Sequence, residues 1–246
     1  RRDDPAFKRL VDDTIAARYR KLAGEAARGD RPVDCSGAFG TALYTDADIA
    51  LLPDSAASFG CGNPTAVLEL GPGERVLDLG SGAGADLILS ARRVGPSGRV
   101  FGLDMLEEML ALARRNCEAA GVLTVELLKG RIEEIPLPAA SVDAVISNCV
   151  LALSSDRRAV LAEVQRVLVP GGRLGISDII ADAELTSDER PRALETIACG
   201  ANPFSAEEYV EALMEAGFVH PKVTITHGVA DGLHAALIRA ATPPHA

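Results

Sequence analysis

Residues 74–104, ERVLDLGSGAGADLILSARRVGPSGRVFGLD, indicate the fold class of the chain. This stretch starts with a short apolar run at residues 76–79, which has the length of a buried strand. Three glycines follow, and residues 86–94 then have a helical pattern before a second apolar run at residues 99–103. Asp104 ends that run and is placed to accept hydrogen bonds from ribose hydroxyls. The order strand, glycine turn, helix, strand, acid predicts the first βαβ unit of a nucleotide-binding α/β sheet.

The glycine turn is compatible with more than one ligand. Gly80, Gly82 and Ala85 satisfy a dinucleotide fingerprint. Gly80, Gly82 and Gly84 instead match the turn that is usual in methyltransferases that use S-adenosylmethionine. Asp78 inside the first strand favours S-adenosylmethionine over a dinucleotide. A degenerate site that binds nothing is the third alternative.

Composition limits the class of protein. The chain has 246 residues, which fits one α/β domain with additions and allows a large core. Its formal net charge of −10 argues against DNA or RNA as a partner, because phosphate binding needs clustered Lys and Arg. No apolar run has the length of a membrane span, and the charged N-terminus lacks the apolar segment of a signal peptide. We therefore expect a cytoplasmic protein without a membrane partner, and a monomer, since no long exposed apolar stripe is evident.

The rest of the sequence continues the alternation of strands and helices. Further helices are expected at residues 3–28, 45–52, 65–70, 107–120, 157–168 and 205–216. Further strands are expected at residues 125–129, 142–147, 173–177, 223–226 and 234–239, the last two as an antiparallel pair. The helix at residues 3–28 is expected either to lie across the mouth of the cofactor site or to serve only for packing.

Two parts are expected in the chain. Residues 1–64 would hold the N-terminal helix and cap loops that carry cysteines, and residues 65–246 would hold the main domain. That domain is expected to contain a substrate-binding insertion at residues 178–204, after the fifth strand.

The five cysteines are the second informative feature. In the cytoplasm they are expected to be free, redox-active or ligating rather than paired in structural disulfides. Cys149 follows the fourth strand, and Cys61 and Cys199 lie on loops that could fold over the same carboxyl edge of the sheet. Three thiolates converging there would bind a soft, thiophilic atom. Cys117, inside a helix, is expected to be a small buried hydrophobic residue, and Cys35 stays open between these two roles.

Between about residues 44 and 218 the sequence resembles the arsenite methyltransferases that use S-adenosylmethionine. The segments that carry the resemblance are LPDSAASFGCGNP, LDLGSGAGADLILSARRVGPSGRVFGLDM, GRIEEIPLP, SVDAVISNCV, RVLVPGGRLGISDI and EEYVEALMEAGF. GCGNP and SNCV are quite specific, because generic class I methyltransferases do not share them. The resemblance implies an α/β, class I, Rossmann-like fold with a seven-stranded sheet. That sheet would be mostly parallel with an antiparallel last strand, and an N-terminal helical cap and an insertion after strand five would be added to it.

The resemblance also implies an activity and its ligands. The expected reaction is methylation of trivalent arsenic by S-adenosylmethionine, as arsenic detoxification, with a small thiol or a thioredoxin-like protein as reductant. The arsenic ligands carried over from the family are Cys61, Cys149 and Cys199. The family also uses an N-terminal cysteine that pairs oxidatively with the GCGNP cysteine, and Cys35 is the candidate for it. The positions expected at the cofactor are Asp78, Gly80, Ser81, Gly82, Gly84, Asp86, Asp104, Met105, Ile132, Glu133 and Asn148.

Two departures from the family's pattern leave other substrates open. Ala152 replaces an Asn after SNCV, and Thr196 stands where the family has a Trp three residues before its third cysteine. One alternative is a class I methyltransferase that acts on carbon or oxygen of a small organic molecule. The other is a sensor that binds S-adenosylmethionine or a metalloid without turnover. Arsenic carries no proton to remove, which agrees with the lack of a convincing His or carboxylate base near the strand tips.

Three histidines recur every seven residues, at His220, His227 and His234. This spacing raises the possibility of a zinc site. The residues flank expected edge strands and a turn, so solvated loop histidines are the favoured interpretation and no metal other than arsenic is expected.

Overall fold

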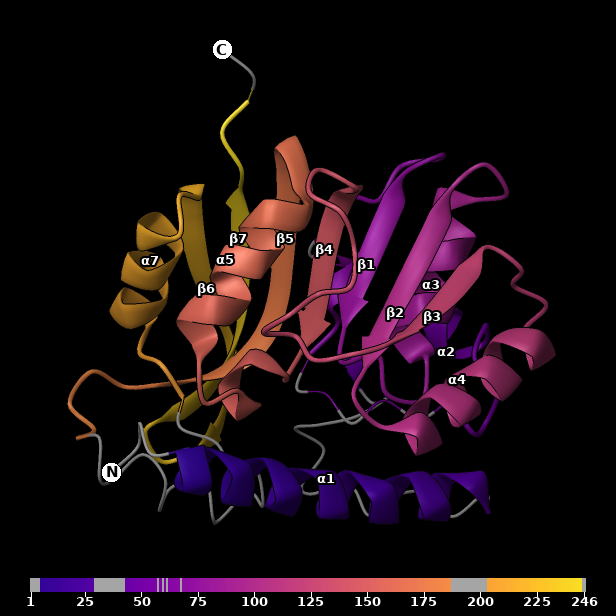
Figure 1. The fold of residues 1–246 in the computed structure, drawn as a ribbon, viewed down its shortest axis with the longest axis horizontal. Helices are drawn as coiled ribbons and strands as arrows, with labels where there is room; N and C mark the ends of the chain where they lie inside the picture. Colours follow the sequence, from indigo (N-terminus) through magenta and orange to yellow (C-terminus); the bar gives the residue numbers. More distant parts are fainter. Residues whose placement is uncertain are drawn as a thin grey trace.

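The centre of the fold, seen in a computed structural model, is a seven-stranded sheet in the order β3-β2-β1-β4-β5-β7-β6 (Figure 1). The structure describes residues 5–28, 43–56, 58, 60, 62–66, 68–186 and 203–244. The strands are β1 (Arg75–Leu79), β2 (Arg99–Asp104), β3 (Val125–Lys129), β4 (Val142–Asn148), β5 (Leu168–Ala181), β6 (Val219–Ala230) and β7 (Leu233–Ala241). The strands β1 to β5 are parallel, and β7 is antiparallel to β5 and β6, which confirms the expected class I fold.

The described part of the chain also contains helices, several of which connect consecutive strands. They are α1 (Pro5–Ala27), α2 (Asp46–Ile49), α3 (Ala85–Val94), α4 (Glu107–Ala119), α5 (Arg157–Val167) and α7 (Ala206–Glu215), with the short 3-10 turns η2 (Pro64–Ala66) and η3 (Leu151–Leu153). Side chains cap the N-termini of several of these helices. The Thr45 side chain accepts a hydrogen bond from the Asp48 N–H, and Ser205 forms a capping box with Glu208.

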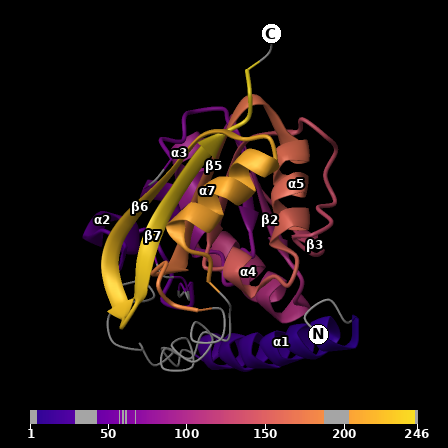
Figure 2. The same ribbon diagram turned by 90° about the vertical axis from the view of Figure 1, so that its left-hand side faces the viewer.

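The central strands are buried on both faces because their side chains alternate between two helical layers. Val76 of β1 belongs to the apolar cluster that includes Leu87 of α3. Its neighbour Leu77 belongs to the cluster on the other face, with Val160 of α5 and Leu213 of α7. Figure 2 shows α5 and α7 on one side of the sheet and α3 on the other. This arrangement explains why the strand sequences are continuous apolar runs.

Helix α1 crosses the end of the sheet where the parallel strands finish (Figure 1). Its small residues Ala16 and Ala23 pack with Leu106 and Met109. Leu106 is the N-cap residue of α4, and Met109 lies in the first turn of that helix. The sheet order reverses between β1 and β4, and ligands of open α/β sheets bind beyond the carboxyl ends at such a point. The predicted N-terminal helix is therefore confirmed, and it lies over the edge where the site is expected.

The fifth strand is longer than the sequence predicted. We expected it to end at Ser177 and an insertion to begin at Asp178, but β5 continues to Ala181 and pairs with β7 over its whole second half. The acid at position 178 suggested a loop. Its carboxylate is instead fully buried and accepts a hydrogen bond from the Tyr209 hydroxyl at 2.7 Å, which satisfies a charge that a strand would otherwise exclude.

Two other expected elements differ from the structure. The helix expected at residues 65–70 is only the 3-10 turn η2, because the chain turns again at once with a hydrogen bond from the Leu70 N–H to the Leu68 carbonyl. The closing strand pair is much longer than expected, with 12 residues in β6 and 9 in β7. Bulges in β6 interrupt the alternation of side chains, which hid its full length in the sequence.

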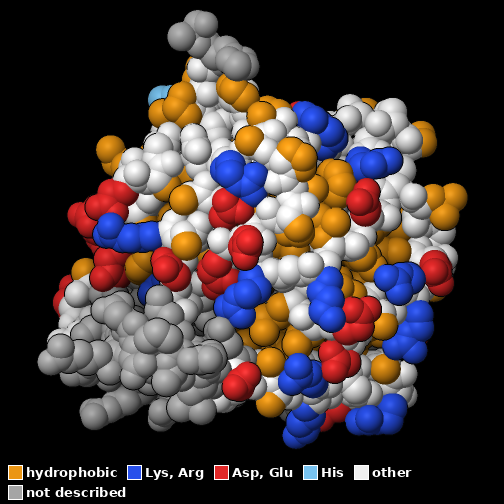
Figure 3. All heavy atoms as spheres, viewed as in Figure 1, with side chains coloured by type: hydrophobic (Ala, Val, Ile, Leu, Met, Phe, Trp, Pro, Cys, Tyr) orange, Lys and Arg blue, Asp and Glu red, His pale blue; other side chains and the backbone are white. Residues whose placement is uncertain are grey.

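The surface seen in Figure 3 carries Lys and Arg side chains interspersed with Asp and Glu, between patches of apolar atoms. Opposite charges form pairs there and elsewhere, such as Arg158 with Glu215 at 3.0 Å. Within the described residues, none of the helices is both long enough and apolar enough to cross a membrane.

Candidate active site

The turn between β1 and α3 has the backbone that the three glycines predicted. Gly80, Gly82 and Gly84 have φ values of +68°, +51° and +90°, a region that side chains other than glycine rarely adopt. A Cβ at Gly80 would also lie 2.5 Å from Val150 Cγ2, on the turn that follows β4. The turn can therefore bring bare backbone up to a ligand at the carboxyl ends of β1 and β4.

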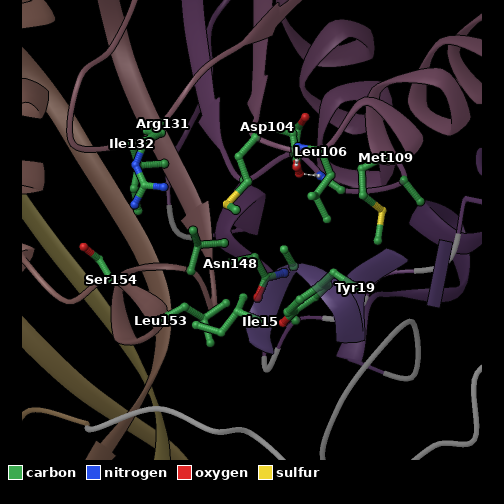
Figure 4. A pocket seen from close by; sticks show the side chains of 18 of the residues that line it. Ile15, Tyr19, Asp104, Leu106, Met109, Arg131, Ile132, Asn148, Leu153 and Ser154 are labelled. Atoms are coloured by element: carbon green, nitrogen blue, oxygen red, sulfur yellow. Dashed lines mark hydrogen bonds between the residues drawn. The ribbon is translucent and has the colours of Figure 1, made fainter. Parts of the chain in front are cut away.

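A pocket lies against this turn (Figure 4). Nine of the predicted cofactor residues line it: Gly80, Ser81, Gly82, Asp86, Asp104, Met105, Ile132, Glu133 and Asn148. Asp78 and Gly84 do not line it, since Asp78 lies below the turn in β1 and Gly84 caps α3 against Ala113.

Helix α1 forms a wall of the same pocket. Ile15, Ala16 and Tyr19 line it, and Figure 4 shows Ile15 and Tyr19 pointing toward Asn148 from below. The helix thus packs on α4 and also lines the pocket, which confirms the first of the two alternatives and excludes a role in packing alone. The pocket residues that we did not predict include Tyr19, Arg131, Val150, Leu153 and Ser154. The apolar spacing of residues 15–19 predicts the helix α1. Leu153 and Ser154 belong to a turn without such a periodic apolar pattern.

Asp104 at the end of β2 joins two elements. Its carboxylate accepts hydrogen bonds from the Gly82 N–H at 3.0 Å and from the Leu106 N–H at 2.9 Å. Burial raises the pKa of Asp104, and these backbone N–H groups oppose that increase. The carboxylate therefore fixes the glycine turn relative to the start of α4 while one edge of the residue still faces the pocket.

Asp86 in the first turn of α3 lies in a second hydrogen-bonded group. Its Oδ1 is 2.9 Å from the Tyr44 hydroxyl, and its Oδ2 accepts a hydrogen bond from the Asn148 side-chain amide at 3.2 Å. Burial raises the pKa of Asp86 to about 6, and the hydrogen bonds from Tyr44 and Asn148 limit that increase.

Several buried polar atoms in the pocket wall or directly below the glycine turn have no hydrogen-bond partner among the described residues. These are Oδ2 of Asp78, the hydroxyl of Ser81 and Oδ1 of Asn148. Burial and the nearby charges of Asp86 and Asp104 raise the pKa of Asp78 well above its usual value. Unpaired acceptors beside several carboxylates suit a cationic ligand that carries amino and hydroxyl donors. S-adenosylmethionine, with its ammonium, sulfonium and ribose hydroxyls, has this chemistry.

The opposite end of the pocket is lined by the loop after β3 and the turn after β4. The Ser154 hydroxyl donates a hydrogen bond to Glu133 Oε1 at 2.6 Å, and Arg131 Nε lies 3.4 Å from Glu133 Oε2. Ile132 packs against the main apolar cluster, and Met105 is 36% exposed. This end offers the apolar and polar surfaces that a planar base requires.

Cys149 immediately follows β4, and its two neighbours Asn148 and Val150 line the pocket. Its φ of +57° is unusual for a residue with a side chain, and its N–H donates to the Ser177 carbonyl at 2.7 Å. The side chain is 8% exposed and lies in an apolar cluster with Ile179, among others. Cys149 is disulfide-bonded in this structure, whereas a thiolate was expected at this position.

The other cysteines divide into two groups. Cys35, Cys61 and Cys199 all lie outside the described residues, so their predicted roles remain predictions. Cys117 is a free, buried thiol in α4, as expected, and burial raises its pKa to about 11.

The three histidines lie on strands rather than in solvated loops, which corrects that expectation. His220 and His227 belong to β6 and His234 to β7. His234 Nε2 is 2.9 Å from Asp182 Oδ1, so one of them already has a carboxylate partner. No group of three His, Cys, Asp or Glu side chains arranged to hold a metal occurs within the described ranges.

Comparison with known proteins gives the same class of enzyme. A family model described as a methyltransferase domain matches residues 70–217. An arsenite methyltransferase of Halobacterium salinarum is 37% identical over 89% of this chain and 61% of its own length. One from Aquipseudomonas alcaligenes is 36% identical over 69% of this chain and 50% of its own length. The crystal structure of an arsenic(III) S-adenosylmethionine methyltransferase from Chlamydomonas reinhardtii has a TM-score of 0.65 and 28% identity, and the match covers 90% of this chain and 73% of that one.

The chain belongs to the methyltransferase-domain family. Its fold and its pocket are those of the class that uses S-adenosylmethionine as cofactor. The chain spans only about half to three fifths of the length of the two curated relatives, with 50% and 61% of them covered.

Replacing Gly80 by Ala is expected to lower the affinity for S-adenosylmethionine by more than about tenfold, because the new methyl group collides with Val150 and strains the turn. Gly95→Ala is a matched control, since Gly95 has the same φ of +68° but no atom within 4 Å of the added Cβ. Calorimetric titration with the cofactor measures both. Equal affinities of the two variants would contradict the conclusion that the Gly80 turn lies against the cofactor.

Cofactor affinity is expected to fall as the pH decreases through about 6, where Asp86 takes up a proton and loses its negative charge. A folded-state pKa above the ordinary value means that the carboxylate is present above pH 6 and absent well below it. Protonation of one such group lowers the cofactor affinity by at most about tenfold per pH unit. Titrations with S-adenosylmethionine from pH 5 to 8 measure this slope. The Asp86→Asn variant should bind weakly with a flatter slope, and an unchanged slope would assign the effect to another group.

Proposed function

We propose that the protein transfers a methyl group from S-adenosylmethionine to trivalent arsenic that is held by cysteine thiolates. The observation that carries the proposal is the position of Cys149 between two residues, Asn148 and Val150, that line the cofactor pocket. An atom bound to the Cys149 sulfur would therefore lie close to residues that contact the cofactor. The left-handed backbone at Cys149 costs roughly 1–3 kcal/mol, and such strain is concentrated at functional sites.

The loop around Cys61 supports the same proposal. Its flanking residues Gly60 and Gly62 lie very close to the end of β4 and to the middle of β5. A Cβ added to them would lie 2.0 Å from Asn148 Oδ1 and 1.9 Å from Ser177 Oγ, respectively. The Gly62 carbonyl also accepts a hydrogen bond from Asn148 Nδ2 at 2.8 Å. The described residues on both sides of Cys61 thus lie beside β4 and β5, close to Cys149, which supports Cys61 as a ligand.

The third proposed ligand, Cys199, belongs to the segment between β5 and α7. The described residues before and after this segment lie near Cys149. The Ala181 N–H donates a hydrogen bond to the Phe204 carbonyl, and Leu185 packs in the same apolar cluster as Cys149. This attachment supports Cys199 as a ligand, and the resemblance to the arsenite methyltransferases supports its identity. Cys35 is proposed only as an oxidative partner for Cys61.

The chemistry of thiolate ligands fits this acceptor. S-adenosylmethionine supplies a sulfonium methyl group, which is transferred when the arsenic lone pair forms the As–C bond and the C–S electron pair remains on sulfur. The cysteine sulfurs would hold the arsenic and orient its lone pair toward the pocket. The carboxylates of Asp86 and Asp104 would hold the cofactor, and Asp78 would support the turn from below. Gly80, Ser81, Gly82, Gly84, Met105, Ile132, Glu133 and Asn148 are the other residues proposed to contact the cofactor or shape its site.

An organic acceptor would need a base or a carbon that is already nucleophilic, and the described residues offer a poor base. Asp178 is a buried carboxylate within β5, and burial raises its pKa to about 6. Both of its oxygens are already occupied, by the N–H groups of Ile179 and Ala152 and by the Tyr209 hydroxyl. An acceptor such as arsenic, which brings its own lone pair and no proton, is therefore favoured.

Because Cys149 is disulfide-bonded, a thiol reductant must open the site before arsenic can bind. A small thiol or a thioredoxin-like protein is the proposed reductant in arsenic detoxification. The test is a reaction of purified protein with S-adenosylmethionine, arsenite and excess thiol, followed by mass spectrometry of arsenic species and of S-adenosylhomocysteine. Methylated arsenic formed in step with S-adenosylhomocysteine is expected. Tight arsenite binding without product would show a sensor, and neither binding nor product would direct the search to an organic acceptor.

A further inference from the structure

Tyr44 connects parts of the site that are far apart in the sequence. It lies just before α2, is 5% exposed and does not line the cofactor pocket. Its hydroxyl is 2.9 Å from Asp86 Oδ1, 3.1 Å from Asn148 Nδ2 and 3.2 Å from Ser58 Oγ. One buried hydroxyl thus contacts the start of α3, the end of β4 and the loop that leads to Cys61.

Asn148 extends this connection to the far side of Cys61. Its side-chain amide lies within hydrogen-bond distance of the Gly62 carbonyl, the Asp86 carboxylate and the Tyr44 hydroxyl. Ser58 does the same on the near side, since its hydroxyl accepts a hydrogen bond from the Gly60 N–H at 3.2 Å. The loop is therefore held on both sides of Cys61 by side chains that meet at Tyr44.

The same side chains face the cofactor. Asp86, Asn148, Ser58 and Gly60 all line the pocket, and Asn148 Oδ1 is a buried acceptor without a partner among the described residues. A donor of the cofactor that binds to Asp86 or to Asn148 Oδ1 would fix these side chains in the orientation that holds the loop. Arsenic bound to Cys61 and Cys149 would fix the loop from the other side.

We infer that Tyr44 is a positioning residue that couples the two sites, so that the cofactor and trivalent arsenic each increase the affinity of the protein for the other. The inference rests on the proposed function. Each ligand orders side chains that the other also needs ordered, so the second ligand to bind loses less conformational freedom. Coupling between binding sites is reciprocal and is typically about 5–150-fold.

The test measures arsenite binding with and without S-adenosylhomocysteine, which occupies the cofactor site but has no methyl group to transfer. Bound arsenic is determined by equilibrium dialysis and elemental mass spectrometry in the presence of a phosphine reductant. We expect about tenfold tighter arsenite binding with S-adenosylhomocysteine in the unaltered chain and less than about twofold in Tyr44→Phe. Calorimetric titration of S-adenosylhomocysteine, with and without arsenite, should give the same two factors.

Tyr209→Phe is the matched control. It also removes a buried tyrosine hydroxyl bonded to a buried carboxylate, that of Asp178, but at a place that does not line the pocket. It should keep the tenfold coupling. If Tyr44→Phe does not fold, Ser58→Ala serves as the milder variant, because it removes the contacts to Tyr44 and to the Gly60 N–H.

The outcomes separate the inference from the proposed function. Equal arsenite affinities with and without S-adenosylhomocysteine in the unaltered chain would overturn the coupling and leave the proposed function standing. Full coupling in both Tyr44→Phe and Ser58→Ala would overturn the role of Tyr44. No arsenite binding in any state would remove the proposed function and the inference together.

Discussion

Replacing Cys149 by Ser is expected to lower the formation of methylated arsenic by more than about 100-fold. Loss of a group that only hydrogen-bonds to a metal ligand typically lowers affinity or activity by roughly 10–100-fold, and loss of a direct ligand has a larger effect. Serine has nearly the same size as cysteine, so the turn after β4 should keep its shape. The oxygen of serine is a hard ligand that holds a thiophilic atom weakly. Mass spectrometry of the arsenic products measures the effect, and titration with S-adenosylhomocysteine should show an unchanged cofactor site.

The control for this variant is Cys117→Ser. Cys117 is a free thiol that is buried in α4, and burial raises its pKa to about 11, so it stays protonated and is a poor ligand. Its replacement removes one thiol from the chain without touching the carboxyl edge of the sheet. We expect it to retain activity. Similar losses in Cys117→Ser and Cys149→Ser would mean that the reaction does not depend on the particular position of Cys149.

Replacing Gly62 by Ala is expected to lower arsenic methylation by about 100-fold, with little change in cofactor affinity. The added Cβ would lie 1.9 Å from Ser177 Oγ, so the loop that carries Cys61 must move away from β5. A displacement of about 1 Å in a reacting group is enough for a loss of this size. Initial rates at saturating cofactor measure it, and circular dichroism confirms that the variant is folded.

A second substitution tests whether the collision is the cause. Ser177→Gly removes the two side-chain atoms that the new Cβ would meet within 3 Å, Oγ and Cβ of Ser177, and keeps the carbonyl that accepts the Cys149 N–H. In the Gly62→Ala background it should restore most of the lost activity, although glycine in a strand lowers the free energy of unfolding by about 1 kcal/mol. No recovery in the double variant would show that the close contact between this loop and β5 is not what positions the ligands.

The parts of the fold that the sequence predicted are those in which local patterns and packing agree. The unit from β1 to β2 combines a short apolar strand, three glycines and a helical pattern, and these features together favour one structure. The end of β5 was missed because Asp178 is charged, and only the tertiary partner Tyr209 makes that charge acceptable inside a strand. The length of β6 was missed because bulges break its alternation.

The candidate site shows the same division. The residues predicted at the cofactor lie on the ends of consecutive strands, where topology alone brings them together. Tyr44 and Ser58 lie on either side of α2, outside any helix or strand. The contacts of Tyr44 with Ser58 and Asn148 depend on how this segment folds back across the sheet. Leu153 and Ser154 line the pocket from a turn whose position depends on Asp178, through the Ala152 N–H. Such contacts carry no periodic signal in the sequence.

The measurement that tests the proposed site most directly is X-ray absorption at the arsenic edge, recorded on reduced protein with arsenite and S-adenosylhomocysteine. It counts the atoms bound to arsenic and distinguishes sulfur from oxygen. We predict three sulfur neighbours in the unaltered chain and in Cys117→Ser, and two sulfurs with one oxygen in Cys149→Ser. The same three sulfurs in Cys149→Ser, or a shell made only of oxygen in the unaltered chain, would contradict thiolate-held arsenic beside the cofactor.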